Sequence, residues 1–296
     1  MVGTGIALLT ALAWAASTTI LKFLTAKIDT LSLNALRLWF GSVPILSFVF
    51  IWGKGFDFIH TPFLPLFFVA SSGILALAIG DTIFIKSLTF IDASRAFPIT
   101  QCTFLLLTMT VSLLFLEESF TWVNIIGAIF VVVGVYLVAV AGKEAKTSSY
   151  GGMNVKGVIL ALIASLAWTA GAVTLKLGVT EMDAFVAAAI RTPASAIAIT
   201  GLVISRSRKR EILQFKKYGR RNMALAFGGG ALSYGVASVS YAAAMQLIGA
   251  GKTVLITAVA PIFILPFSIV LLKEQPTIYA KVGIIISVFG IGMLTI

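Results

Sequence analysis

The sequence is built from two copies of one pattern. Landmarks at Leu12–Trp14, Leu21–Lys22 and Arg37 recur in the same order 154 residues later, at Leu166–Trp168, Leu175–Lys176 and Arg191. Four more positions recur 156 residues later, where Glu118, Thr121, Gly127 and Gly134 match Glu274, Thr277, Gly283 and Gly290. An internal duplication accounts for both blocks. We therefore predict a first repeat over residues 1–145, a linker over residues 146–154 and a second repeat over residues 155–296.

Apolar stretches of membrane-spanning length fill both repeats. Hydrophobic residues make up 59% of the chain and charged residues 11%, whereas soluble domains normally carry about 25% charged residues. A spanning helix needs about 20 mostly apolar residues. The expected fold is an all-α integral membrane protein with ten transmembrane helices, near residues 4–26, 32–52, 63–88, 93–116, 122–141, 155–178, 184–205, 222–247, 252–272 and 277–296.

The number of spans in each repeat sets how the two repeats are related in the membrane. Five is odd, so the second repeat must cross in the opposite sense, which makes two inverted five-helix repeats. Repeats of this kind are common in secondary transporters, whose substrate site lies near the midplane where the halves meet. The sequence therefore favours a transporter that works by alternating access.

Basic residues predict the orientation. Loops that follow odd-numbered spans hold 16 Lys and Arg residues, whereas loops that follow even-numbered spans hold only Lys54 and Lys252. Because cytoplasmic loops carry the excess of positive charge, we expect a multi-pass protein of the plasma membrane with both termini extracytoplasmic. Contact with anionic membrane lipid explains the net charge of +11, so no nucleic-acid partner is expected.

Two charged residues inside the spans form a candidate pair. Charged side chains within a bilayer are rare and costly, so each one needs a partner or a role. Asp81 lies roughly 10 Å inside the membrane, at 1.5 Å per residue, and Arg37 lies at a similar depth from the same side. We predict an ion pair between them, with either a structural role in fixing helix register or a role in proton coupling.

The second repeat lacks this acidic partner. It keeps Arg191 but has Ala237 at the position that corresponds to Asp81. Arg191 is therefore expected to pair with Glu181 or Asp183, which lie near the outer ends of their spans.

Aromatic and hydroxyl side chains mark the expected substrate cavity. Trp14 and Thr18 share one helical face because they are four residues apart, and Trp168 repeats the position of Trp14. A tryptophan this deep in a span is either packed core or cavity wall, and hydroxyl residues alternatively serve close helix packing. We expect the cavity to be lined by Trp14, Thr18, Gln101, Trp168, Tyr234, Ser238, Tyr241 and Thr257. Pro98 and Pro261 are candidate hinges or gates, because a proline frees a backbone carbonyl in its helix.

The sequence offers little for catalysis or metal binding. His60 is the only histidine and falls in an expected loop, so neither a Ser-His pair nor a histidine-rich metal site is expected inside the membrane. One intramembrane aspartate cannot form a carboxylate dyad, and no Walker phosphate-binding loop occurs. We expect no enzymatic activity, no metal and no cofactor.

Several motifs, taken in order, resemble a known family. Each repeat has Leu-Ala-Trp in its first span, Arg in its second, a small-residue turn into its fourth (Asp92–Ala96 and Gly249–Thr253) and Leu-x-Glu before a glycine-spaced fifth span. This arrangement resembles the drug/metabolite transporter superfamily, specifically its EamA-type carriers, over nearly the whole chain. The resemblance implies a ten-helix carrier with a central cavity that moves small metabolites, often outward. Members often have a proline at the position of Leu105. This chain has Leu at that position and has Pro98 seven residues earlier.

The resulting hypothesis is a secondary transporter that exports a small amphipathic metabolite, such as an amino acid. Its expected partners are that small-molecule substrate, membrane lipid and, as a candidate coupling ion, the proton; it is expected to be a monomer or a homodimer. Two alternatives remain open from the sequence. One is a passive channel or facilitator, and the other is a non-transporting membrane scaffold or lipid-handling protein.

Overall fold

Helices form all the regular structure of the described residues. The computed structural model describes residues 1–24, 27–55, 57, 61–87, 90, 93–141, 154–180, 182–205, 215–260, 262–263 and 278–294. Its first half contains α1 Val2–Leu24, α2 Thr30–Ile51, α4 Phe63–Gly73, the π-helix η1 Ile74–Gly80, α5 Asp81–Ser87, α6 Ala93–Phe115 and α7 Trp122–Ala141. Its second half contains α8 Val155–Val179, α9 Ala184–Ser205, α11 Phe215–Gly230, the π-helix η2 Ala231–Val236, α12 Ala237–Ile248, α13 Ala250–Thr257 and α15 Ile278–Leu294.

Many of these helices are long and apolar enough to cross a membrane. Within the described residues six stretches meet this description: Val2–Leu21, Thr30–Ile51, Phe63–Ser87, Val155–Val179, Ala184–Ser205 and Tyr218–Ile248. Shorter apolar helices occupy Ile99–Phe115, Trp122–Leu137 and Lys281–Met293. Large apolar side chains such as Phe63, Trp122 and Ile285 are mostly exposed, as lipid-facing residues are. The chain is therefore a multi-pass membrane protein. Residues 261 and 264–272 of the expected span 252–272, and most of the expected linker 146–154, lie outside the described residues.

Polar residues at the helix starts position two of the spans. The carboxylate of Asp29 accepts hydrogen bonds from the backbone N–H groups of Leu31 and Ser32 at the start of α2, and Asn154 caps α8 in a similar way. Such caps satisfy N–H groups that have no partner within the helix. They fix where these spans begin, and hence the depth of Arg37 and Trp168.

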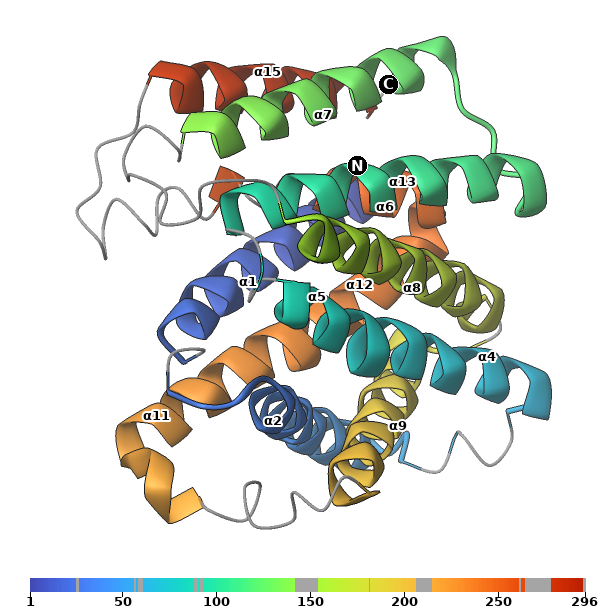
Figure 1. Ribbon diagram of the computed structural model, residues 1–296. Helices are drawn as coiled ribbons and strands as arrows, with labels where there is room; N and C mark the ends of the chain where they lie inside the picture. Colours follow the sequence, from blue (N-terminus) through green and yellow to red (C-terminus); the bar gives the residue numbers. More distant parts are fainter. Residues whose placement is uncertain are drawn as a thin grey trace.

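The helix contacts follow the sequence duplication. Corresponding helices of the two halves pack against each other, as α2 does with α9 and α7 with α15. The contacts of α4 and α5 with α8 have their counterparts in the contacts of α11 and α12 with α1. Figure 1 shows α7 and α15 side by side at one edge, apart from the helices that surround the centre. Residues between the central helices can therefore form one cavity that both repeats share.

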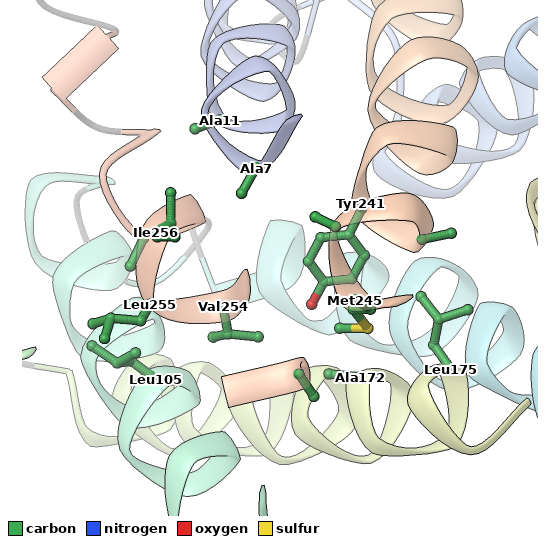
Figure 2. Close-up of a cluster of buried hydrophobic side chains, with 14 of the residues drawn as sticks. Ala7, Ala11, Leu105, Ala172, Leu175, Tyr241, Met245, Val254, Leu255 and Ile256 are labelled. Carbon is green, nitrogen blue, oxygen red and sulfur yellow. The ribbon is translucent and has the colours of Figure 1, made fainter. Parts of the chain in front are cut away.

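Small residues allow close packing around that centre. Figure 2 shows Tyr241 and Met245 of α12 together with Ala172 and Leu175 of α8 in the largest buried apolar cluster. Alanines at helix contacts let backbones approach, which favours association in a membrane. The cluster holds α12 against α8 and so positions Tyr241.

Two spans differ from the continuous α-helices expected from the sequence. The expected span 63–88 contains η1, and the expected span 222–247 contains η2, so each is α-helical on both sides of a π-helical segment. The two segments occupy corresponding positions in the two repeats, immediately before Asp81 and Ala237. A π segment inserts an extra residue into an α-helix and often occurs at functional sites. The face that each helix presents therefore changes within the span.

Candidate functional site

A cavity of about 140 Å³ lies among the central helices. Its walls come from α1, α2, α5, α6, α8, α9, α12 and both π segments. The lining residues are Trp14, Thr18, Leu21, Arg37, Ala76, Leu77, Asp81, Phe84, Ile85, Gln101, Phe104, Trp168, Ala172, Arg191, Ser233, Tyr234, Tyr241 and Ala260. The cavity thus combines aromatic walls with a few charged and polar groups, as small-molecule sites commonly do.

Most of the residues expected in the cavity lie on its wall. These are Trp14, Thr18, Gln101, Trp168, Tyr234 and Tyr241, joined by Arg37 and Asp81. Two hydroxyl residues are not among the lining residues: Ser238 accepts a hydrogen bond from Thr192 of α9, and Thr257 donates to the backbone carbonyl of Thr253 within its own helix α13. The side chain of Pro98 and all of Pro261 lie outside what the structure describes, so the expected hinges are not located.

Asp81 is surrounded by neutral hydrogen-bonding groups. Trp168 donates its indole N–H to Oδ1 of Asp81 at 2.9 Å, and the hydroxyl oxygen of Tyr234 lies 2.7 Å from Oδ2. The same hydroxyl oxygen lies 2.8 Å from Oδ1 of Asn34. The side-chain amide of Asn34 in turn donates to the backbone carbonyl of Leu77. A polar chain therefore connects α8, α5, η2 and α2 across the cavity.

The direct ion pair expected between Arg37 and Asp81 is not formed. Arg37 lies across the ring of Tyr234, with Cζ 5.0 Å from the ring centroid, and its Nη2 donates to Oγ of Ser17 at 3.0 Å. Tyr234 therefore stands between the two charges. In the described part of the chain the salt bridge present is between Lys54 and Asp183.

Arg191 also reaches the cavity. It does not pair with Asp183, one of the two residues expected as its partner. Its Nε donates to Oγ of Ser72 at 2.8 Å, and its Cζ lies 5.7 Å from the ring centroid of Tyr241. Asp183 lies eight residues earlier, about 12 Å along a helix at 1.5 Å per residue, and it pairs with Lys54 instead. Glu181 lies outside the described residues.

Sequence reasoning missed the polar residues that hold the charged ones. Ser17, Asn34 and Ser72 are each almost fully buried, and each contacts one of the groups described above. Asn34 offered a usable signal, because it lies one helical turn before Arg37 and a buried amide inside a span needs a partner. Ser17 and Ser72 offered none, because buried serines in membrane helices usually serve close packing.

The cavity is closed toward one end of the molecule. We call this the opposite end because it lies across the molecule from the connection between α1 and α2. It contains the connections between α2 and α4, between α8 and α9, and between α12 and α13. There Lys54 pairs with Asp183, Gln246 donates to the backbone carbonyls of Val179 and Met182, and Glu118 binds the start of α13. The oxygens of Glu118 accept hydrogen bonds from the backbone N–H groups of Ala250 and Gly251, at 2.6 and 3.0 Å.

The cavity reaches toward the other end, which we call the basic end and define by the α1–α2 connection, the end of α5 and the start of α11. Leu21, Phe84 and Ile85, which line the cavity, lie within one turn of the ends of α1 and α5. At this end Lys27 contacts Asn222 of α11. Contacts between helices therefore close the opposite end, whereas the cavity lining extends toward the basic end.

Comparison with known proteins identifies the family. The model of the EamA-like transporter family matches residues 1–140 and 155–296. This chain belongs to that family. The description of that family is of transporters.

Individual relatives are more distant. The "Uncharacterized transporter YvbV" of Bacillus subtilis (strain 168) is 29% identical over 156 residues, covering 51% of this chain and 49% of that protein. The "Probable glucose uptake protein GlcU" of Priestia megaterium is 28% identical over 172 residues, covering 56% of this chain and 57% of that protein. The matches thus span about half of each relative.

A solved structure shares the fold of this EamA-family chain. That crystal structure matches with a TM-score of 0.81 at 16% identity, over 99% of this chain and 96% of the other. The similarity extends to the whole helical arrangement.

Proposed function

We propose that this protein is a secondary transporter that exports a small amphipathic metabolite, such as an amino acid, by alternating access. Ten transmembrane helices in two inverted repeats would form it, with the basic end in the cytoplasm and both termini outside. The observation that carries the proposal is the central cavity, which has Trp14, Trp168 and Asp81 on its walls and whose lining extends toward the basic end, while a salt bridge and hydrogen bonds close the opposite end. A carrier needs such a site, accessible from one side at a time.

The two π segments support alternating access. They lie in corresponding helices of the two repeats, and Ala76, Leu77, Ser233 and Tyr234 within them line the cavity. π-helical segments inside α-helices frequently occur at functional sites, and we propose these two as the hinges. With the opposite end sealed, the conformation corresponds to a carrier that opens toward the cytoplasm.

The hydrogen bonds around Asp81 support proton coupling. The Tyr234 hydroxyl has one hydrogen, yet its oxygen is within 2.8 Å of two acceptor oxygens, on Asp81 and Asn34. The Asn34 amide nitrogen is engaged with the Leu77 carbonyl, so its oxygen faces Tyr234 as an acceptor. Every contact is satisfied when Asp81 is protonated, because it then donates to Tyr234, which donates to Asn34. Asp81 is therefore the proposed proton-binding group.

Replacing Asp81 by Asn tests this proposal in reconstituted vesicles. Asn offers an N–H where the protonated acid offers an O–H, so we expect Asp81→Asn to keep solute counterflow but to lose accumulation driven by a pH gradient. Accumulation that follows the pH gradient equally in both proteins would contradict the coupling role. Flux that neither saturates nor shows counterflow would indicate a channel, and vesicles without any solute flux would indicate a non-transporting protein.

A sugar is a second candidate substrate. One relative bears the name of a probable glucose uptake protein, and Trp14 and Trp168 in this cavity offer aromatic faces beside hydrogen-bonding groups. A screen of transport into vesicles with amino acids, nucleosides, amines and glucose as solutes separates an amino-acid substrate from a sugar.

A further inference from the structure

We infer that the cavity selects solutes that carry an acidic group, and that Arg37 and Arg191 bind this group. The inference rests on the transport function proposed above and narrows its substrate class. Arg37 and Arg191 are corresponding residues of the two repeats, and both line the cavity. They approach it from α2 and α9, which pack against each other. Two cations thus face one small volume.

Neither arginine forms a salt bridge with a carboxylate among the described residues. Arg37 is 5% exposed and Arg191 is 3% exposed, yet their side-chain hydrogen bonds go to the hydroxyl groups of Ser17 and Ser72. Each guanidinium also lies against a tyrosine ring. Nε of Arg37 is buried without a hydrogen-bond partner. Donor capacity therefore remains unused at the cavity wall.

The charge balance of the cavity favours an anion. Asp81 is the acidic residue among those that line it, and its oxygens are occupied by Trp168 and Tyr234. With Asp81 ionised the lining carries a net charge of +1, and with Asp81 protonated it carries +2. Buried charges are costly unless they are paired. An anionic solute removes this cost, whereas a cationic solute increases it.

The chemistry of arginine defines the group that is recognised. Guanidinium groups donate several N–H groups in a planar fork and bind carboxylates and phosphates in preference to neutral groups. The aromatic walls at Trp14 and Trp168 then accommodate the remainder of the solute. The substrate class is a small organic acid, with the amino group of an amino acid tolerated but not required.

Binding to matched solutes tests the inference on the purified full-length protein. The probes are 2-oxo acids, amino acids and amines with the same side chain, in one aromatic and one branched aliphatic series, together with glucose and inorganic phosphate. We expect the 2-oxo acids and the amino acids to raise the thermal unfolding temperature, and the amines and glucose to leave it unchanged. A shift with phosphate but not with the carboxylates would assign the site to phosphorylated solutes.

Substitution of each arginine tests its role. Arg37→Gln and Arg191→Gln should weaken acid binding about 30-fold or more, the cost of removing one partner of a buried charge contact. Arg37→Lys and Arg191→Lys keep the charge without the fork and should lose less, which guards against a folding defect in the Gln variants. Lys156→Gln, an exposed basic residue at the start of α8, is the matched control and should bind like the parent protein.

Failure of this inference and failure of the transport function give different results. Binding and vesicle flux of amines or glucose, with none for the acids, would overturn acid selection while leaving a transporter. Unchanged acid affinity in both Gln variants, or no response to any acid, would also overturn it. Absence of flux for every solute, with acid binding intact, would refute transport alone.

Discussion

At the scale of single residues, one half-buried ion pair contributes to closing the opposite end. Lys54 and Asp183 join the end of α2 to the start of α9, and Trp52 stacks beside them on Phe185. Partial burial raises the pKa of Asp183, but hydrogen bonds from Lys54 and from the backbone N–H of Phe185 outweigh it and lower the pKa overall. The hydrogen bond with Asp183 raises the pKa of Lys54 above its usual value.

The signs of these shifts predict a contact that persists over a wide pH range. Because the pKa of Asp183 is lowered, its carboxylate stabilises the closed end above the usual pKa of 3.8, and this stabilisation is lost only as the pH falls through the lowered pKa. Because the pKa of Lys54 is raised, its ammonium group stabilises the closed end below 10.5, and this stabilisation is lost as the pH rises through the raised pKa. Hydrogen exchange of the amides of residues 182–187 should therefore be equally protected, after correction for intrinsic rates, at pH 5 and pH 8.

Charge reversal tests the same contact. Lys54→Asp should reduce this protection because it places two carboxylates together, and it leaves Asp183 bonded to the backbone N–H of Phe185. Lys54→Arg keeps the charge and should keep the protection, and Lys156→Asp, away from the pair, serves as the control. If Lys54→Asp is as protected as the parent protein, the pair does not hold the opposite end closed.

At the scale of elements, the π segments decide which residues share a face. Gly80 ends η1, and a Cβ at this position would lie 2.5 Å from Cδ1 of Trp168. The absence of a side chain lets the indole approach the helix and donate to Asp81, the next residue. The glycine thus links the shape of η1 to the polar chain of the cavity.

Gly80→Ala should therefore damage the site although alanine favours helix. Displacement of the Trp168 ring should destabilise the protein by about 1–3 kcal/mol, the usual cost of overpacking, and should impair pH-driven accumulation. Gly228→Ala is the matched control, because nothing lies within 4 Å of a Cβ there, and it should be neutral or stabilising. Thermal unfolding and vesicle transport measure both effects. Equal behaviour of the two variants would show that Gly80 has no special role.

At the scale of the whole molecule, the carboxylate of Glu118 also connects the two repeats at the opposite end. Glu118 follows α6 of the first repeat, and it binds backbone N–H groups at the start of α13 in the second. A negative charge at a helix N-terminus is favourable, because unpaired N–H groups and the helix dipole both attract it. Opening of the opposite end must break this contact.

Glu118→Ala should therefore shift the conformational equilibrium toward opening of the opposite end, by about 1.5–3 kcal/mol for a charged hydrogen-bonded contact. Spin labels on the exposed positions Leu64 and Leu114, near the start of α4 and the end of α6, measure the separation across that end. We expect a longer-distance population in Glu118→Ala and not in Glu117→Gln, since Glu117 is exposed. Identical distance distributions in the two variants would contradict this role.

The sequence by itself determined the class of protein and much of the cavity. Low charge and long apolar runs require a membrane environment, and family membership confirms a transporter. A charged residue deep inside a span is costly unless it has a partner or a role, and tryptophan and tyrosine usually lie at the membrane interfaces. Asp81, Trp14, Trp168 and Tyr234 could therefore be selected before any contact was known. Each of them lines the cavity.

Only the tertiary structure decided which groups meet. Helical spacing identifies residues on one face but not the neighbour that faces them, so the sequence paired Arg37 with Asp81, whereas Tyr234 from the other repeat stands between them. Spacing also assumes a regular helix. The π segment η2 interrupts that regularity, and Ser238 accepts a hydrogen bond from Thr192 of α9, whereas Tyr241 lines the cavity.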